Sequence, residues 1–266
     1  MNTISLAVTD SSTMLRRNLL RMRRYPSMTL LLIGLPILFL LLFVYVFGGT
    51  LGAGLSGVAV GADSRAEYLT YVTPAILLMA AASAAQGTAI SVAMDRTEGI
   101  FARFRTMAIS PSSVLTGHVL GSVIQSLLAM GALLGVSVLL GFRPDASPLG
   151  WLALFCLLTF TAFALTWLCV GFGLVSESVE TASNLPMFLV ILPFLSSGFV
   201  PVDSMPAGLA WFAEHQPFTP IIETVRGLFT GNADTATALI AVGWCALIAL
   251  VGYLWSRKLY RRDPTR

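Results

Sequence analysis

Long runs of apolar residues without a charge constrain this chain more than any other feature. The first run, from Met28 to Thr50, contains LLLIGLPILFLLLFVYVF and no charged side chain. A membrane-spanning helix needs about 20 mostly apolar residues, because roughly 30 Å of hydrocarbon is crossed at about 1.5 Å per residue. The apolar part of a cleavable signal peptide is shorter, about 7–15 residues. The run therefore predicts a first membrane-spanning helix.

Five similar segments follow along the chain. The six predicted spans are residues 28–50, 68–94, 113–141, 151–175, 184–200 and 235–255, and the fifth is short and contains Pro186 and Pro193. Apolar residues make up 56% of the 266 residues and charged residues only 11%, against roughly 25% charged residues in soluble domains. We therefore expect an all-α membrane protein with six transmembrane helices, forming a single transmembrane domain.

The basic residues are distributed unevenly among the segments that flank the spans. Thirteen of the sixteen fall in segments that lie on one side of a six-span chain: residues 1–27, 95–112 and 256–266. Arg65, Arg143 and Arg226 lie on the other side. Loops rich in Lys and Arg stay in the cytoplasm, so both termini are expected there. The single lysine among many arginines, with abundant Ala and Gly, is typical of a GC-rich bacterial genome. The expected location is therefore a bacterial plasma (inner) membrane.

The stretch between the fifth and sixth spans, residues 201–234, is apolar only in short pieces. Ala207 to Ala213 and Pro220 to Phe229 are too short to cross a bilayer, and Pro217 separates them. Apolar segments of about 10–14 residues are typical of interfacial or re-entrant elements. We therefore expect an outer re-entrant helical region in this stretch.

The residues that ATP hydrolysis or metal chemistry requires are missing. A phosphate loop needs G-x-x-x-x-G-K-[ST], and the only lysine, Lys258, stands at the end of the last span. The only histidines, His118 and His215, lack metal-ligand spacing, and the three cysteines lie inside apolar runs without a C-x-x-C pattern. The sequence predicts no catalytic residue, no cofactor and no metal site.

The predicted spans contain no Asp, Glu, Lys or Arg away from their ends, which argues against ion-coupled transport. The polar residues inside the spans are milder and include Gln86, His118, Gln125 and Thr166. Such groups most often join helices by hydrogen bonds. The alternative is that Gln86, Gln125 and Thr166 line a substrate path, which would be largely apolar and would suit an amphipathic or lipid-like molecule.

An amphipathic pattern marks the segment before the first span. From Met14 to Arg24, apolar residues recur at helical spacing and arginines occupy the opposite face. This pattern is typical of a helix that lies on the membrane surface and contacts lipid. We therefore expect an N-terminal interfacial helix.

The loop 95–112 also has an apolar and a basic face. Phe101 and Phe104 lie on the first, and Arg103 and Arg105 on the second. The loop is either another interfacial helix or an element that docks into a cytoplasmic partner, with its arginines against acidic groups.

Three loose motifs occur in order along the chain. They are E-G-x-x-x-R-x-R from Glu98 to Arg105, GFVPVDSMP from Gly198 to Pro206, and QPFTPIIETVRGL from Gln216 to Leu228. In this order the chain resembles the type-2 ABC exporter permeases, in particular the daunorubicin-resistance permease branch, over essentially its whole length. The last motif is similar to the family's N-P-x-[ST] and E-x-x-R pattern, with Gln216 where asparagine is usual.

The resemblance implies a membrane subunit that pairs with a separate ABC ATP-binding subunit and forms a permease homodimer. It also implies roles for two groups of residues. The ATPase-coupling helix would contain Glu98, Gly99, Phe101, Arg103, Phe104 and Arg105. The outer gate would contain Gly198, Pro201, Pro206, Pro217, Glu223 and Arg226.

The expected function is ATP-driven export of a hydrophobic or amphipathic small molecule or lipid, such as a drug, an antibiotic or a glycolipid. No nucleic acid is expected as a partner. The alternative is a non-transporting membrane scaffold or assembly factor that recruits cytoplasmic partners through its arginine-rich loops. A neighbouring gene for a phosphate-loop ATPase would favour export over the scaffold.

Overall fold

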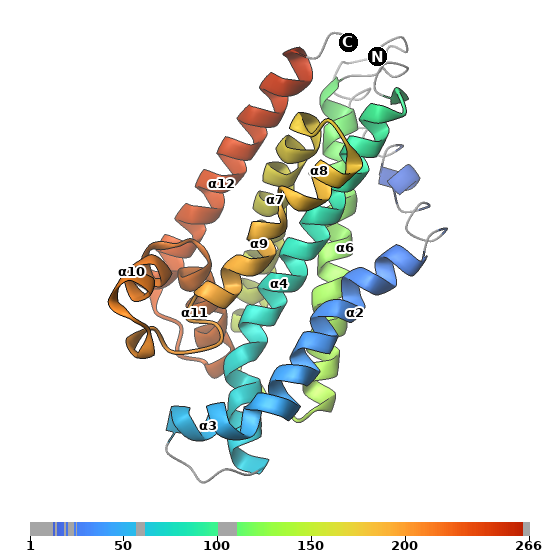
Figure 1. Cartoon of the computed structure of the whole chain (residues 1–266). Coiled ribbons are helices and arrows are strands. Elements are labelled where there is room, and N and C mark those ends of the chain that lie inside the picture. Colours follow the sequence, from blue (N-terminus) through green and yellow to red (C-terminus); the bar gives the residue numbers. More distant parts are fainter. Residues whose placement is uncertain are drawn as a thin grey trace.

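The computed structural model describes residues 26–56, 62–100 and 111–262, together with residues 13, 15–18, 20 and 24. Within these residues every regular element is helical, which confirms the expected all-α class. In chain order (Figure 1) the elements are α2 (Pro26–Leu42), η1 (Phe43–Phe47), α3 (Gly48–Ser56), α4 (Ala62–Thr97), α6 (Pro111–Leu139), α7 (Pro148–Val175), α8 (Val179–Asn184), α9 (Met187–Ile191), η2 (Leu192–Leu195), η3 (Val202–Ser204), α10 (Ala207–His215), α11 (Phe218–Thr230) and α12 (Thr235–Arg262).

Among the described residues, five helical segments are long and apolar enough to cross a membrane. They are Leu32–Leu55, Ser64–Thr97, Leu115–Leu139, Pro148–Val175 and Thr235–Tyr260. These segments coincide with five of the six predicted spans. Several boundaries differ from the prediction by a few residues. The largest differences are that α3 continues the first helical run to Ser56, that α4 begins at Ala62, and that α12 continues to Arg262, into the region predicted as a tail.

The fifth predicted span, residues 184–200, is not one continuous helix. The chain forms α8, α9 and η2 in succession and then turns. Pro186 and Pro193 explain the breaks, because proline lacks an amide donor and disfavours helical geometry in the residue before it. The helical pieces start at Val179, inside the predicted loop 176–183, and form a shorter apolar stretch, Val179–Leu195.

The long helices from α2 to α7 alternate in direction along the chain (Figure 1). Leu32, near the start of α2, lies against Gly87 in the second half of α4, whereas Gly52 of α3 lies against Ser64 at the start of α4. Helices α7 and α12 are neighbours that run in the same direction. The chain between them therefore has to return along the bundle, and α8, α9 and η2 lie on this return path (Figure 1).

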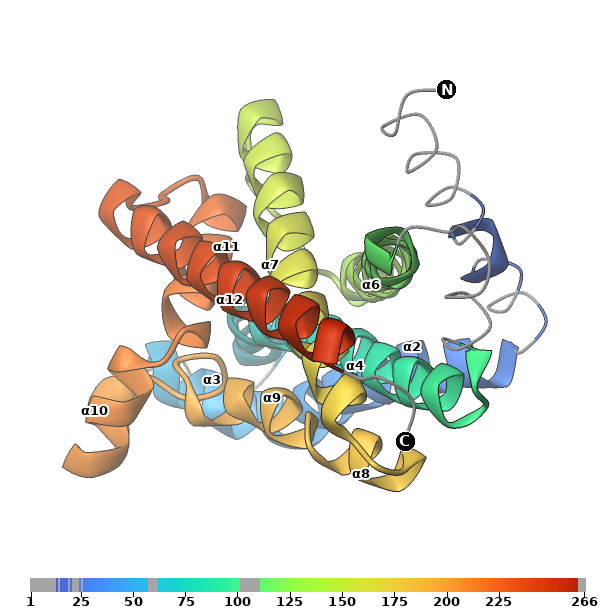
Figure 2. The ribbon, with the colours of Figure 1, turned by 90° about the horizontal axis from the view of Figure 1, so that it is seen from above.

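Helix α4 is the centre of the bundle. It packs against α2, α6, α7, α8, α9 and α11, and Figure 2 shows it among them along the bundle axis. Its middle contains AILLMAAASAA from Ala75 to Ala85, and these residues are buried. In a bilayer, helices are surrounded by lipid, so the hydrophobic effect contributes little to their association. Close van der Waals packing of small side chains stabilises the contact between helices instead. The alanines of α4 therefore allow its neighbours to approach closely.

The two ends of the bundle differ in charge. Helices α4 and α12 end on the same side, so Arg96, Arg257 and Lys258 share what we call the basic end (Figure 1). Arg65, at the start of α4, and Arg143, after α6, lie at the opposite, far end.

Two helices that start at the far end have polar caps. The Ser147 hydroxyl accepts a hydrogen bond from the Gly150 amide at the start of α7, and Pro148 follows it directly. The Asp234 carboxylate precedes α12 and accepts from the Thr237 hydroxyl at 2.7 Å and from its amide at 2.8 Å. The bonds from Thr237 lower the pKa of the Asp234 carboxyl. These caps satisfy amides that the first turn of a helix cannot pair internally.

Candidate functional site

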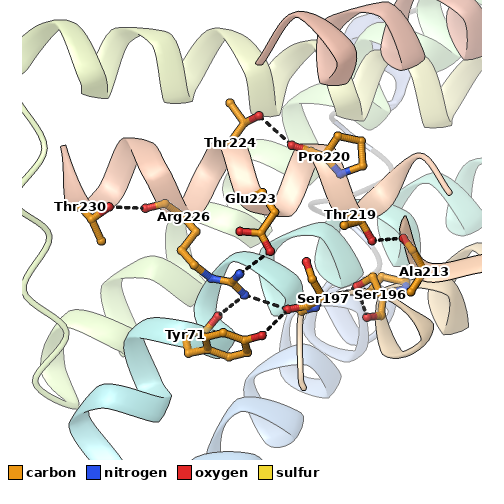
Figure 3. A network of polar contacts seen from close by, with 12 residues as sticks. Tyr71, Ser196, Ser197, Ala213, Thr219, Pro220, Glu223, Thr224, Arg226 and Thr230 are labelled. Carbon is orange, nitrogen blue, oxygen red and sulfur yellow. Dashed lines mark hydrogen bonds and ion pairs between the residues drawn. The ribbon is translucent and has the colours of Figure 1, made fainter. Parts of the chain in front are cut away.

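A polar network in the far half of the bundle joins α11 to α4 and to the turn after η2 (Figure 3). Arg226 of α11 donates hydrogen bonds to Glu223 Oε1 at 2.6 Å, to the Ser197 carbonyl at 3.0 Å and to the Tyr71 carbonyl at 3.2 Å. Its guanidinium also lies over the Tyr71 ring, 3.8 Å from the ring centroid. We call Tyr71, Ser197, Glu223 and Arg226 the far-end network. One side chain thus connects three segments that are distant in sequence.

The local sequence explains why these carbonyls are free to accept. Pro74 in α4 has no amide, so the Thr70 carbonyl loses its helical partner and the carbonyls beside it turn outward more readily. The Tyr71 carbonyl is the next along the helix. Ser197 lies in the turn after η2, where no helical amide follows. The Tyr71 hydroxyl donates to the Ser197 carbonyl at 2.7 Å as well, so this carbonyl accepts hydrogen bonds from two side chains.

The far-end network is only partly satisfied. The side chain of Arg226 is 17% exposed and that of Glu223 is 38% exposed, so the ion pair is at the edge of the protein interior. Arg226 Nε and Ser197 Oγ are buried and have no hydrogen-bond partner among the described residues. Buried polar groups without partners are costly, and they often mark sites with a second arrangement.

Three of the six predicted gate residues, Gly198, Glu223 and Arg226, fall on or beside this network. Gly198 lies directly on α4, because a Cβ atom there would lie 2.4 Å from the Ala75 Cβ. Pro201, Pro206 and Pro217 immediately precede η3, α10 and α11 respectively, where the fixed φ of proline suits the start of a helix. The three prolines therefore set the helix starts and do not join the network.

Gln216 has a structural role that its sequence position did not reveal. Its side chain is buried, and Nε2 donates to the Leu195 carbonyl at 3.1 Å and to the Leu192 carbonyl at 3.3 Å. These carbonyls belong to the last turn of η2, where intrahelical donors run out. Gln216 therefore connects the turn between α10 and α11 to η2. Tyr71 and Ser197 were also missed, although Pro74 marks α4 as a helix with an unpaired carbonyl.

Two of the three residues predicted to line a substrate path, Gln86 and Thr166, make contacts between helices. Gln86 Nε2 of α4 donates to the Ser183 carbonyl of α8 at 2.6 Å. Thr166 Oγ1 of α7 lies 3.2 Å from Ser122 Oγ of α6. Gln125 of α6 is half-buried. These contacts favour the interpretation that polar residues inside the spans join helices.

The predicted coupling residues are described only in part. Glu98 is exposed and Gly99 has a φ of 70°, a left-handed conformation that ends α4 at no steric cost to glycine. Phe101, Arg103, Phe104 and Arg105 lie outside the described residues. Of the predicted N-terminal interfacial helix, residues 15–18 are described and helical.

Comparison with known proteins identifies the family. The profile described as ABC-2 type transporter matches residues 9–230. The daunorubicin resistance ABC transporter permease protein DrrB1 of Streptomyces coeruleorubidus is 29% identical over 257 residues, covering 96% of this chain and 87% of that protein. The probable doxorubicin resistance ABC transporter permease protein DrrC of Mycobacterium tuberculosis is 26% identical, covering 87% and 80%. Nodulation protein J of Rhizobium leguminosarum bv. viciae is 27% identical, covering 84% and 85%.

The family profile covers most of the chain, so this protein belongs to the ABC-2 type transporter family. The similarity to the two drug-resistance permeases confirms the predicted daunorubicin-resistance branch. The resemblance inferred from three loose motifs is therefore correct.

Proposed function

We propose that this chain is the permease subunit of an ATP-driven exporter that moves a hydrophobic or amphipathic molecule out of the cell. The observation that carries the proposal is the family match over residues 9–230. A drug, an antibiotic or a glycolipid fits the neutral, mostly apolar interior of the bundle. The names of two relatives, which are resistance permeases for daunorubicin and doxorubicin, point to the same kind of molecule.

The energy source in this proposal is a separate ABC ATP-binding subunit. The chain has no phosphate loop, and its one lysine, Lys258, lies near the end of α12. The working unit is a homodimer of this chain with two ATP-binding subunits. The loop 101–110, which connects α4 to α6 at the basic end, docks into the ATP-binding subunit as the coupling helix.

The proposed membrane arrangement has six crossings in a bacterial inner membrane, with both termini in the cytoplasm. The segment from α8 to η2 is the fifth crossing, supported by the parallel direction of α7 and α12 on either side of it in sequence. The basic end of the bundle faces the cytoplasm, in agreement with the positive-inside rule. Residues 201–234 then lie at the outer face.

The far-end network is the latch of the outer gate in this proposal. Helix α11 packs against α4, α7 and α12 in the far half of the bundle, and Arg226 holds α11 against α4 and the 196–199 turn. Hydrogen bonds donated by a charged guanidinium are stronger than those between neutral groups. All three of these bonds are donated by the single side chain of Arg226. Movement of that single side chain would release α11, which is what a gate requires during alternating access.

The test of the proposed function is purification followed by reconstitution. The tagged chain is solubilised gently from its native membrane, and proteins that purify with it are identified by mass spectrometry. We expect a stoichiometric phosphate-loop ATPase, and ATP-dependent uptake of a fluorescent hydrophobic substrate into inside-out vesicles. Glu98→Ala is expected to lower substrate-stimulated ATP hydrolysis with normal membrane insertion. Reproducible absence of an ATPase, with other cytoplasmic proteins in its place, would instead favour the scaffold.

The topology predicts opposite labelling of two exposed positions. In a background with the three native cysteines replaced by serine, Ser204→Cys is expected to react with a membrane-impermeant maleimide in intact cells. Ser204 is exposed in η3, seven residues after Ser197 of the far-end network, whereas Lys258 is exposed at the basic end. Lys258→Cys is the matched control and is expected to react only after permeabilisation. Labelling of Lys258→Cys in intact cells, with Ser204→Cys protected, would reverse the proposed orientation.

A further inference from the structure

A buried carboxylate at the basic end joins three segments of the chain. Asp95, in the last turn of α4, has a side chain only 2% exposed. Arg17 Nη2 lies 2.5 Å from its Oδ2, and His118 Nε2 of α6 lies 3.1 Å from the same oxygen. His118 is 4% exposed and Arg17 is 33% exposed. We call these three residues the Asp95 cluster. A buried carboxylate is costly unless it is paired, so the cluster fixes the three segments relative to one another.

Neighbouring contacts strengthen the same junction. Asn18 Nδ2 donates to the Gly117 carbonyl of α6 at 2.9 Å. A Cβ atom at Gly121 would lie 3.0 Å from the Asn18 Cβ, so Asn18 lies directly on α6. Arg96, next to Asp95, donates to the Ser176 carbonyl after α7 at 3.0 Å. The end of α4 is thus connected to residues 17–18, to α6 and to the end of α7.

The position of the cluster along the chain gives it mechanical importance. Asp95 lies within about two helical turns of the start of the 101–110 loop, and His118 lies about two turns after its end. The two residues therefore stand on opposite flanks of the loop, and a force on the loop reaches both of them. Arg17 adds the segment that precedes the first predicted span.

We propose that Arg17, Asp95 and His118 are positioning residues that make the amino-terminal segment, α4 and α6 move as one unit when the ATP-binding subunit displaces the 101–110 loop. This inference rests on the proposed function. Separating a buried ion pair leaves an uncompensated charge, so the junction resists being pulled apart during the movement. Without the Asp95 charge, the 101–110 loop can be displaced without a matching movement of α4 and α6.

The test compares transport with ATP hydrolysis in reconstituted vesicles that contain the chain and its ATP-binding subunit. The variants are Asp95→Asn, which keeps the size of the side chain and removes its charge, and Arg17→Gln. We expect ATP hydrolysis to persist and the amount of substrate transported per ATP to fall by about tenfold, as for residues that carry coupling between sites. Arg16→Gln and Glu67→Gln remove one charge each at exposed positions beside Arg17 and on α4, and they are expected to behave as wild type.

A purely structural role would give a different result. In that case the variants would lower the yield or thermal stability of the protein, and the folded fraction would transport as much substrate per ATP as wild type does. The double variant Arg17→Gln/Asp95→Asn should be no worse than Asp95→Asn alone, because both changes break the same Arg17–Asp95 ion pair. Additive losses, or unchanged transport per ATP, would overturn the inference alone. Absence of ATP-dependent transport by the wild-type chain would overturn the proposed function and the inference with it.

Discussion

Replacing Arg226 with methionine is expected to lower the free energy of unfolding by about 2–4 kcal/mol. Methionine retains much of the apolar stem but leaves the Ser197 and Tyr71 carbonyls and the Glu223 carboxylate without their donor. For a chain of this size, each kcal/mol lowers the midpoint of thermal unfolding by about 2–4 °C. The measurement is thermal unfolding of the purified protein in detergent.

Arg143→Met is the matched control for this prediction. Arg143 also lies at the far end, but among the described residues it donates only to the carbonyls of Val138 and Phe142 in its own neighbourhood. Its replacement is expected to change the midpoint very little. Equal losses for both variants would mean that the far-end network has no special stabilising role. In the Arg226→Met background we also expect faster maleimide labelling of Ser204→Cys, since the latch no longer holds α11.

Gly252→Ala is expected to lower the free energy of unfolding by about 1–3 kcal/mol, although alanine is the better helix former by about 1 kcal/mol. A Cβ atom at Gly252 would lie 2.6 Å from the Leu168 amide nitrogen and 2.8 Å from the Trp167 carbonyl carbon. Both are backbone atoms of α7, so they cannot move aside as a flexible side chain would. Helix α12 must therefore move away from α7, which weakens the bond from Ser256 Oγ to the Trp167 carbonyl.

The same helix offers a control of opposite sign. Gly243 of α12 has nothing within 4 Å of the position of an added Cβ atom. Gly243→Ala is therefore expected to raise the free energy of unfolding by about 0.5–1 kcal/mol, through lower backbone entropy in the unfolded chain. Unfolding midpoints of both variants, measured side by side, check the prediction. A shift of the same sign in both would contradict the close approach of α7 and α12.

The features that depend on local sequence could be predicted. The length of an apolar run identifies the long helices, and prolines identify the breaks in the segment from α8 to η2. The spacing of Glu223 and Arg226, three residues apart on a helix, predicts that they share a face. In the structure the two residues of the E-x-x-R pattern form an ion pair.

The partners of these residues could not be predicted. Arg226 reaches the Tyr71 carbonyl across a separation of 155 residues, and Arg17 reaches Asp95 across 78. Such pairs depend on the order and rotation of helices in the bundle. A helix that is apolar on all sides carries no stripe to indicate which face meets which neighbour. Asp95 was also assigned to a loop, because hydropathy alone placed the end of the second span at residue 94, whereas α4 continues to Thr97.

Both polar clusters have a member on α4, and this gives the helix a mechanical property. Tyr71 and Asp95 are about 24 residues apart, which a helix spans in about 36 Å. The connection contains no loop and runs through buried, tightly packed small side chains, so the helix has little space in which to bend. A shift or rotation of α4 at Asp95 is therefore expected to produce a displacement of similar size at Tyr71. Helix α4 thus acts as a stiff connection between the basic end and the far end of the bundle, and Pro74 is the position at which it bends most easily.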